Sequence, residues 1–253
     1  MTNEEIHYDI VSKHLDFTDK HVLEIGCGRG GLTRYMGRVS SAKYINAIEY
    51  DLDFWGMKTS SGLNWDISQG DARNLKFADN LFDCVISIGV FEHINGLDEA
   101  LNELERVLKP GGECFALFEP IYTSIIGHHY NFWVPEDLYL IPPWGHLFMS
   151  QDEMYEHIKS IRDEEVAQKA AKWIYEDQII NRYTRKDYYH ILASSGMTNT
   201  HISEMFCTNR EFRPDNEFFS LSPEQQENLL GRYSKDDLSV RGFEVILQKN
   251  RYW

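Results

Sequence analysis

Residues 21–119 alternate between short apolar runs and stretches of helical periodicity, and this alternation constrains the fold more than any other feature. The clearest helical stretch is residues 96–108, where apolar side chains recur on one face before a Lys-Pro-Gly-Gly sequence. Short apolar runs between such stretches are typical of buried parallel strands. The expected strands are residues 21–25, 43–49, 64–70, 82–88 and 113–119. The pattern predicts an α/β fold with a doubly wound, mostly parallel sheet.

The other segments frame this core, which we take as residues 21–119. Residues 1–20 are expected to form an N-terminal helix and a loop. Residues 120–181 are rich in aromatic residues and prolines and then turn helical, which predicts a cap inserted after the fifth strand on the substrate side. Ser150 and Glu153 have the spacing of a capping box at a helix start within this cap. Residues 182–253 are expected to complete the core sheet.

The charge of the chain limits its partners. It has 40 acidic and 25 basic residues, a formal net charge of −15, which repels a phosphate backbone. The densest basic stretch, residues 182–186, is too short to compensate, so we expect no nucleic-acid partner. No apolar run approaches the roughly 18 residues of a membrane span, and the first residues lack a leader pattern. We therefore expect a cytoplasmic protein without a membrane partner. Reduced thiols are expected at the four widely spaced cysteines, Cys27, Cys84, Cys114 and Cys207.

The segment VLEIGCGRGGL, residues 22–32, places glycines directly after the first expected strand, at positions 26, 28, 30 and 31. Glycine lacks Cβ, so the backbone turns sharply and a ligand lies against its amides. The first, second and fourth glycines satisfy the GxGxxG dinucleotide pattern, and the first three give the GxGxG form of S-adenosylmethionine sites. Glu49 follows Gly28 by 21 positions, near the spacing of a carboxylate that holds a ribose diol. Because both cofactors contain a ribose, the turn alone leaves both open.

Two downstream stretches discriminate between these cofactors. They are GDARNLKFADNLFDCVISIGVFEHI, residues 70–94, and LERVLKPGGECFAL, residues 104–117. With them, the chain resembles the class I S-adenosylmethionine-dependent methyltransferases of small-molecule type over nearly all of residues 20–119. It is also loosely similar to methyltransferases of bacterial surface-polysaccharide pathways. The resemblance implies a Rossmann-like, seven-stranded, mostly parallel sheet, S-adenosylmethionine as cofactor and S-adenosylhomocysteine as product.

The resemblance also implies which residues contact the cofactor. Those expected at its amino-acid end are Glu24, Gly26, Cys27 and Gly28. Those expected at its ribose and adenine are Glu49, Tyr50, Asp71 and Ala72. Those expected to pass near the sulfonium are Ile88 and Gly89.

The expected cap contains the candidates for catalysis. An alcohol acceptor benefits from a base, and histidine titrates near neutral pH. The candidate catalytic residues are Glu119, His128, His129 and His146. Aromatic residues that suit the face of a flat ring stand among them, at Tyr130, Trp133 and Trp144. Each histidine has a structural alternative, as does His93. The histidines and the acid are also a candidate metal site, but they lack regular metal-ligand spacing, and we expect no metal.

These patterns support one functional hypothesis and leave alternatives. The hypothesis is a methyltransferase that acts on a small polar metabolite, by O-methylation of a sugar or a phosphorylated intermediate of a bacterial surface-glycan pathway. The alternatives are an N-methyltransferase of a small amine, a protein that binds S-adenosylmethionine without catalysis, and a nicotinamide-dependent oxidoreductase. A homodimer formed through the aromatic segment is a further expectation.

Overall fold

The computed structural model describes residues 1–130, 140–177, 179–206 and 214–251. The chain divides into two compact units that exchange segments along the sequence. We call them the sheet unit, which comprises residues 1–118, 190–203 and 243–253, and the helical unit, which comprises residues 119–189 and 204–242. Trp133 and Cys207 lie outside the described residues.

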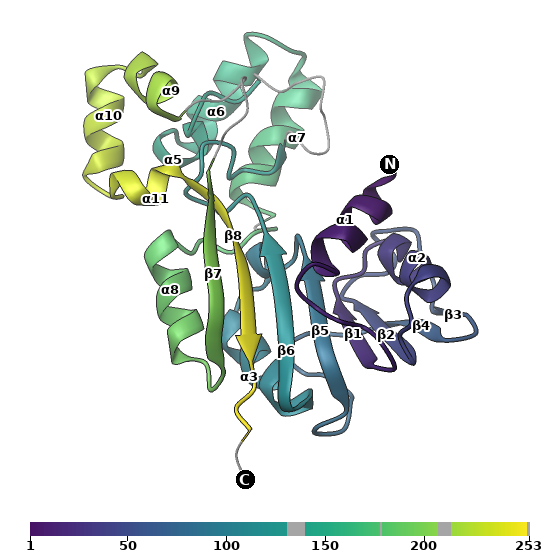
Figure 1. Ribbon diagram of the computed structural model, residues 1–253. Helices are drawn as coiled ribbons and strands as arrows, with labels where there is room; N and C mark the ends of the chain where they lie inside the picture. Colours follow the sequence, from purple (N-terminus) through teal and green to yellow (C-terminus); the bar gives the residue numbers. More distant parts are fainter. Residues whose placement is uncertain (131–139, 178, 207–213, 252–253) are drawn as a thin grey trace. The chain divides into compact units, whose positions relative to one another are not determined.

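The described residues form one eight-stranded sheet with the order β3-β4-β2-β1-β5-β6-β8-β7 (Figure 1). The strands are β1 His21–Ile25, β2 Tyr44–Glu49, β3 Ser60–Ser61, β4 Trp65–Gln69, β5 Phe82–Ile88, β6 Leu108–Phe118, β7 Thr198–Phe206 and β8 Val240–Gln248. The ladder from β4 through β6 is parallel, whereas β3 pairs with β4, and β8 with β6, in antiparallel fashion. The predicted mostly parallel sheet is confirmed. It has one strand more than the seven expected.

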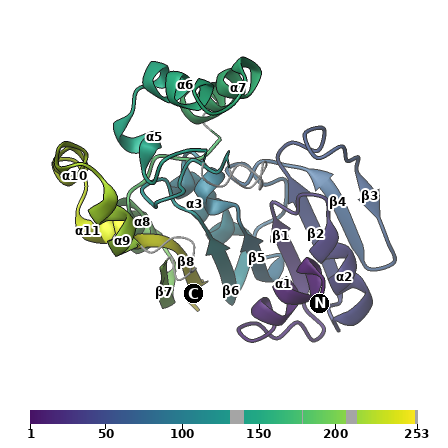
Figure 2. The same cartoon turned by 90° about the horizontal axis from the view of Figure 1, so that it is seen from above.

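Helices cover both faces of this sheet. Helices α1 Asn3–Val11 and α2 Gly31–Val39 lie on one face, and α3 Leu97–Val107 lies on the other (Figures 1 and 2). A short 3₁₀ turn, η1 Phe91–His93, precedes α3, and α8 Arg185–Ser194 precedes β7. The apolar face expected on α3 is buried as predicted, at Leu97, Ala100, Leu101, Leu104 and Val107. The core under α1 and α2 includes Val11, Leu32, Met36 and Ile45.

The helical unit is built from two apolar clusters. Its helices are α5 Gly145–Phe148, α6 Gln151–Lys159, α7 Glu164–Tyr175, α9 Pro214–Ser220, α10 Pro223–Leu230 and α11 Lys235–Ser239. The predicted capping box is present at the start of α6, where the Ser150 side chain accepts from the Glu153 amide. One cluster unites Tyr122 and Trp144 with Leu229 and Leu238 of α10 and α11. The other joins α6 to α7 through Met154, Ile158, Ala167 and Ala170.

The unit boundaries differ from the expected segments. The sequence predicts that residues 182–253 all belong to the core sheet, whereas residues 204–242 group with residues 119–189. The physical reason is the apolar cluster just described, because Leu229 and Leu238 are buried against side chains of the earlier segment. No helix among the described residues is both long and apolar enough to cross a membrane.

Candidate cofactor site and histidine cluster

The glycine turn follows β1 without a break. Gly26 and Gly28 adopt positive φ angles of 70° and 52°. The amides of Gly26 and Cys27 both donate to the Ile48 carbonyl of β2, at 2.8 and 3.0 Å. A Cβ atom at Gly26 would lie 2.3 Å from a methyl carbon of Val90. This position therefore requires glycine both for its backbone conformation and for the close approach of the Val90 side chain.

Glu49, the last residue of β2, lies against this turn. Its Oε2 accepts from the Gly28 amide at 2.7 Å, and its Oε1 accepts from the Tyr50 amide at 2.9 Å. The carboxylate is buried, with 8% of the residue exposed. Parallel pairing of β1 with β2 brings the ends of the two strands together. The fold thus joins two residues that the sequence spacing singled out.

Glu24 lies in β1, two residues before Gly26, and is buried in the sheet unit. Its carboxylate accepts from the Thr33 hydroxyl of α2. Burial, together with the nearby negative charge of Glu49, raises the pKa of Glu24 to about 7. Burial also raises the pKa of the neighbouring Cys27 thiol. Cys27 therefore stays a neutral thiol, and the charge beside the glycine turn depends on Glu24 and Glu49.

Asp71 follows β4 and pairs with a residue that the sequence reasoning missed. Arg73 approaches it in bidentate fashion, with Nη2 2.8 Å from Oδ2 and Nε 3.0 Å from Oδ1. These hydrogen bonds lower the pKa of Asp71. Arg73 also donates to the Asn95 carbonyl at 3.1 Å, which connects this loop to the segment before α3. The nearby basic residue in the Gly-Asp-Ala-Arg sequence was the available signal.

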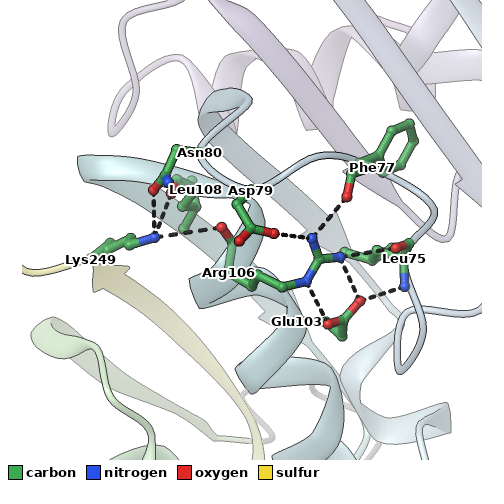
Figure 3. Close-up of polar contacts among 8 residues, drawn as sticks. All are labelled: Leu75, Phe77, Asp79, Asn80, Glu103, Arg106, Leu108 and Lys249. Carbon is green, nitrogen blue, oxygen red and sulfur yellow. Dashed lines mark hydrogen bonds and ion pairs between the residues drawn. The ribbon is translucent and has the colours of Figure 1, made fainter.

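The segment that follows Asp71 and Ala72, residues 75–80, is anchored to α3 (Figure 3). Arg106 donates to the carbonyls of Leu75 and Phe77, at 2.9 and 2.8 Å, and to Asp79 at 2.6 Å. Glu103 accepts from Arg106 at 2.8 Å and from the Leu75 amide at 2.7 Å. Lys249 closes the same region, where its Nζ contacts Asn80 and the Leu108 carbonyl. One arginine thus holds the shape of residues 75–79.

The other expected cofactor contacts differ in exposure. Gly89 follows Ile88 of β5 with a φ of 66°. Ala72 is buried, whereas Tyr50 is 65% exposed. Trp55 was not anticipated, yet its indole is the nearest group to Gly28, 3.7 Å from the place of a Cβ atom there. A tryptophan without a surrounding motif gives no sequence signal for such a position. His93 is exposed.

The three candidate histidines lie together in the helical unit and are buried. Nε2 of His129 donates to the Pro120 carbonyl, and Nε2 of His146 donates to the Tyr122 carbonyl, both at 2.7 Å. The rings of His128 and His146 lie edge to face, with centroids 5.4 Å apart. Burial lowers the pKa of His146 to about 4, and burial also holds the pKa of His128 well below its usual range. Both rings are therefore neutral at neutral pH.

Glu119, the fourth candidate, begins the helical unit. Its Oε1 lies 2.9 Å from Nη2 of Arg241. Burial raises the pKa of Glu119, and the charge of Arg241 opposes that rise. Among the described residues, no group of three or more histidine, cysteine or acidic side chains has the arrangement of a metal site.

Comparison with known proteins shows which family the first part of the sheet unit resembles. Residues 23–116 match the model of the methyltransferase domain family. This segment is similar to methyltransferase domains. Its match begins in β1 and ends in β6, so it includes the glycine turn, Glu49 and the Asp71 loop.

The curated relatives match this chain over different lengths. A sterol 24-C-methyltransferase of Gibberella zeae is 36% identical over 109 residues, which are 41% of this chain and 28% of the relative. A ubiquinone/menaquinone biosynthesis C-methyltransferase of Neisseria meningitidis is 33% identical over 163 residues, 62% of this chain and 64% of the relative. The chain thus spans less than two thirds of either curated relative.

A solved structure shares the fold over nearly the full length. An S-adenosylmethionine-dependent methyltransferase from Mesorhizobium loti aligns with a TM-score of 0.56 at 15% identity. The alignment covers 95% of each chain. At this identity the likeness establishes the class I fold.

Proposed function

We propose that this chain is an enzyme that binds S-adenosylmethionine and transfers its methyl group to a small molecule. The observation that carries the proposal is the contact between the Glu49 carboxylate and the Gly28 amide within a methyltransferase domain. A buried acid at a glycine turn fits a ligand that offers a ribose diol beside its charged end. The relatives, all named as methyltransferases, support the same activity.

The residues of the turn have room for such a ligand. Oε2 of Glu49 accepts one backbone hydrogen bond, from Gly28, and Oε1 accepts two, from Tyr50 and Asp51, whereas a carboxylate has about four acceptor positions. A ribose hydroxyl therefore finds a free lone pair on Oε2 without displacement of Gly28. Bound S-adenosylmethionine supplies an electrophilic methyl group, so the protein needs no covalent nucleophile of its own. Its residues have to align the acceptor and exclude water.

We propose a polar acceptor, with transfer to a hydroxyl of a sugar or a phosphorylated intermediate of a surface-glycan pathway. The relatives named above act, by their names, on sterols and quinones, so the support comes from the polar groups of the helical unit. His146 is the strongest candidate base. Since its Nε2 donates to a carbonyl, its Nδ1 carries a lone pair, and this atom has no hydrogen-bond partner among the described residues. The lowered pKa keeps that lone pair unprotonated at neutral pH.

Calorimetry with S-adenosylhomocysteine tests the cofactor. We expect micromolar binding to the wild type and a loss of at least tenfold in Glu49→Gln and Gly28→Val, with no binding of NADH. Asp9→Asn, which removes one exposed charge on α1, is the matched control and should bind as the wild type does. Binding of NADH with no response to S-adenosylhomocysteine would instead establish the oxidoreductase alternative. Undiminished affinity in Gly28→Val would show that the turn is not the site.

Methyl transfer to a panel of acceptors tests the chemistry. The panel contains nucleotide-linked sugars and phosphorylated sugars, small amines, a sterol and a quinone. We expect transfer to a hydroxyl, and loss of turnover with retained cofactor affinity in His146→Ala or in the corresponding variant of His128 or His129. Transfer to an amine, with rates that follow its deprotonation and do not change in all three variants, would support the N-methyltransferase alternative. Cofactor binding without any transfer would favour the non-catalytic alternative.

The homodimer and the cytoplasmic location expected from the sequence stay predictions. Light scattering after size exclusion measures the first directly. A monomer mass of 29.7 kDa at micromolar concentration would contradict it.

A further inference from the structure

A small pocket lies entirely within the helical unit. It is lined by Tyr122, Gly127, His128, Trp173, Ile174, Ile179, Ile180 and Arg182. It is small and admits one water-sized group. Arg182 is exposed whereas His128 is buried, so the lining runs from the surface of the unit to its interior.

His128, which lines this pocket, also has an unsatisfied hydrogen-bond donor. Its Nδ1 accepts from the Tyr130 amide at 3.1 Å, which places the ring proton of the neutral imidazole on Nε2. Nε2 is buried and has no hydrogen-bond partner among the described residues. A buried donor without an acceptor costs free energy, so the Nε2–H group of His128 favours a ligand oxygen as its acceptor.

Arg182 adds a positive charge at the same place. Its Nη1 donates to the Tyr122 hydroxyl at 3.0 Å, and the guanidinium carbon lies 5.0 Å from the centre of that ring. No carboxylate in the described part of the chain forms an ion pair with Arg182. Burial raises the pKa of Tyr122, and the positive charges of Arg182 and Arg232 oppose that rise. The chain has 40 acidic residues, yet the pocket carries a local positive charge at Arg182.

We propose that this pocket binds one oxygen of an oxyanion group, a phosphate or carboxylate, of a small molecule, and that the rest of the group lies beside the exposed Arg182. The N–H groups of His128 and Arg182 donate to its oxygens, and the guanidinium balances its charge. The isoleucine side chains exclude water, which strengthens these hydrogen bonds. That the ligand is the methyl acceptor rests on the proposed function, whereas binding of the oxyanion does not.

Nuclear magnetic resonance of protein labelled with ¹⁵N-histidine tests this directly. The full chain, in a buffer free of oxyanions and at constant ionic strength, is titrated separately with inorganic phosphate, acetate and glycerol. We expect phosphate or acetate to shift the Nε2–H resonance of His128 with saturation, and the stronger of the two identifies the head group. Glycerol should leave the resonance unchanged. Trp173, which lines the pocket, provides fluorescence as a second readout.

Two variants separate the pocket from the overall charge. Arg182→Gln should weaken binding of the stronger anion by about tenfold or more. Lys169→Gln, which removes an exposed positive charge on α7, is the matched control and should change binding less than twofold. Saturation by glycerol, equal losses in the two variants, or no response of His128 to either anion would each overturn the proposal. Because Arg182 is exposed, Arg182→Gln should stay folded. The test therefore does not depend on variants of the buried His128.

The cofactor experiment keeps the two proposals distinguishable. S-Adenosylhomocysteine binds in the sheet unit under the proposed function, so its affinity in Arg182→Gln should equal that of the wild type. An anion response without S-adenosylhomocysteine binding would uphold the pocket and refute the proposed function. The reverse pattern would refute the pocket alone.

Discussion

Single residues at the glycine turn show how local constraints define this site. The sequence singled out Gly26, Gly28 and Glu49 because bare backbone and a spaced acid leave a readable pattern. The partners of these residues left none. Val90 lies against Gly26 and Trp55 against Gly28 because separate strands and loops converge, and no local periodicity encodes such contacts.

Gly26 and Gly28 should therefore differ in their tolerance of a side chain. Gly26→Ala places Cβ 2.3 Å from Val90 and should lower the free energy of unfolding by more than about 2 kcal/mol. Gly28→Ala meets no atom closer than 3.7 Å, so its cost is backbone strain of about 1–2 kcal/mol. Urea unfolding measures both. In the double variant Gly26→Ala/Val90→Ala, part of the loss should return; purely additive effects would show that the Val90 contact is not the cause.

Glu24 makes the stability of the fold depend on pH. Its pKa rises to about 7 in the folded protein from an ordinary value of 4.5, so the folded state binds this proton more tightly than the unfolded state. Stability from this group is complete below pH 4.5 and is lost as the pH rises towards 7. Between these two pH values the wild type should lose on the order of 3 kcal/mol of its free energy of unfolding, and Glu24→Gln should not show this loss. Urea unfolding at pH 5 and pH 8 measures it, and a wild-type pH profile in the variant would contradict the assignment.

At the scale of elements, strands and helices with strong periodicity could be predicted and their attachments could not. The limits of β1 and β5 coincide with the expected runs, and the capping box begins α6 as anticipated. The two-residue strand β3 is too short for any periodicity to indicate it. The residues that hold the Asp71 loop to α3 lie about thirty positions away, so their pairing is a tertiary property.

Arg106 tests that attachment. Arg106→Gln removes hydrogen bonds to two carbonyls and two carboxylates, and should lower the free energy of unfolding by about 2 kcal/mol or more. Hydrogen exchange at the Leu75 amide, which donates to Glu103, should accelerate in parallel. Arg38→Gln, an exposed arginine in the last turn of α2, should change stability by less than about 0.5 kcal/mol. Equal effects of the two variants would argue against a specific role for Arg106.

At the scale of the whole molecule, the chain passes between the two units at residues 118, 189, 203 and 242. Composition and charge indicated a globular chain without nucleic-acid partners. They carried no information on this division, because the cluster of Tyr122 with Leu229 and Leu238 joins residues more than a hundred positions apart.

An isolated fragment of residues 1–118 should therefore fail to fold cooperatively. It contains the methyltransferase segment yet lacks β8, whose residues pair with Glu113–Phe118 of β6. It also lacks Phe243, whose ring lies 5.5 Å from that of Phe118. We expect a broad or absent thermal transition by circular dichroism, against a cooperative one for the full chain. A sharp transition in the fragment would show that β8 is dispensable.

The hydrogen bond from the Gly28 amide to Glu49 also bears on the rate of cofactor capture. This hydrogen bond fixes the backbone of the glycine turn before any ligand arrives, so the ligand binds a preformed site without rearrangement of the backbone. Ordering costs of that kind slow association and weaken affinity, and here they are met during folding. Capture should then proceed in a single kinetic phase whose rate rises linearly with ligand concentration.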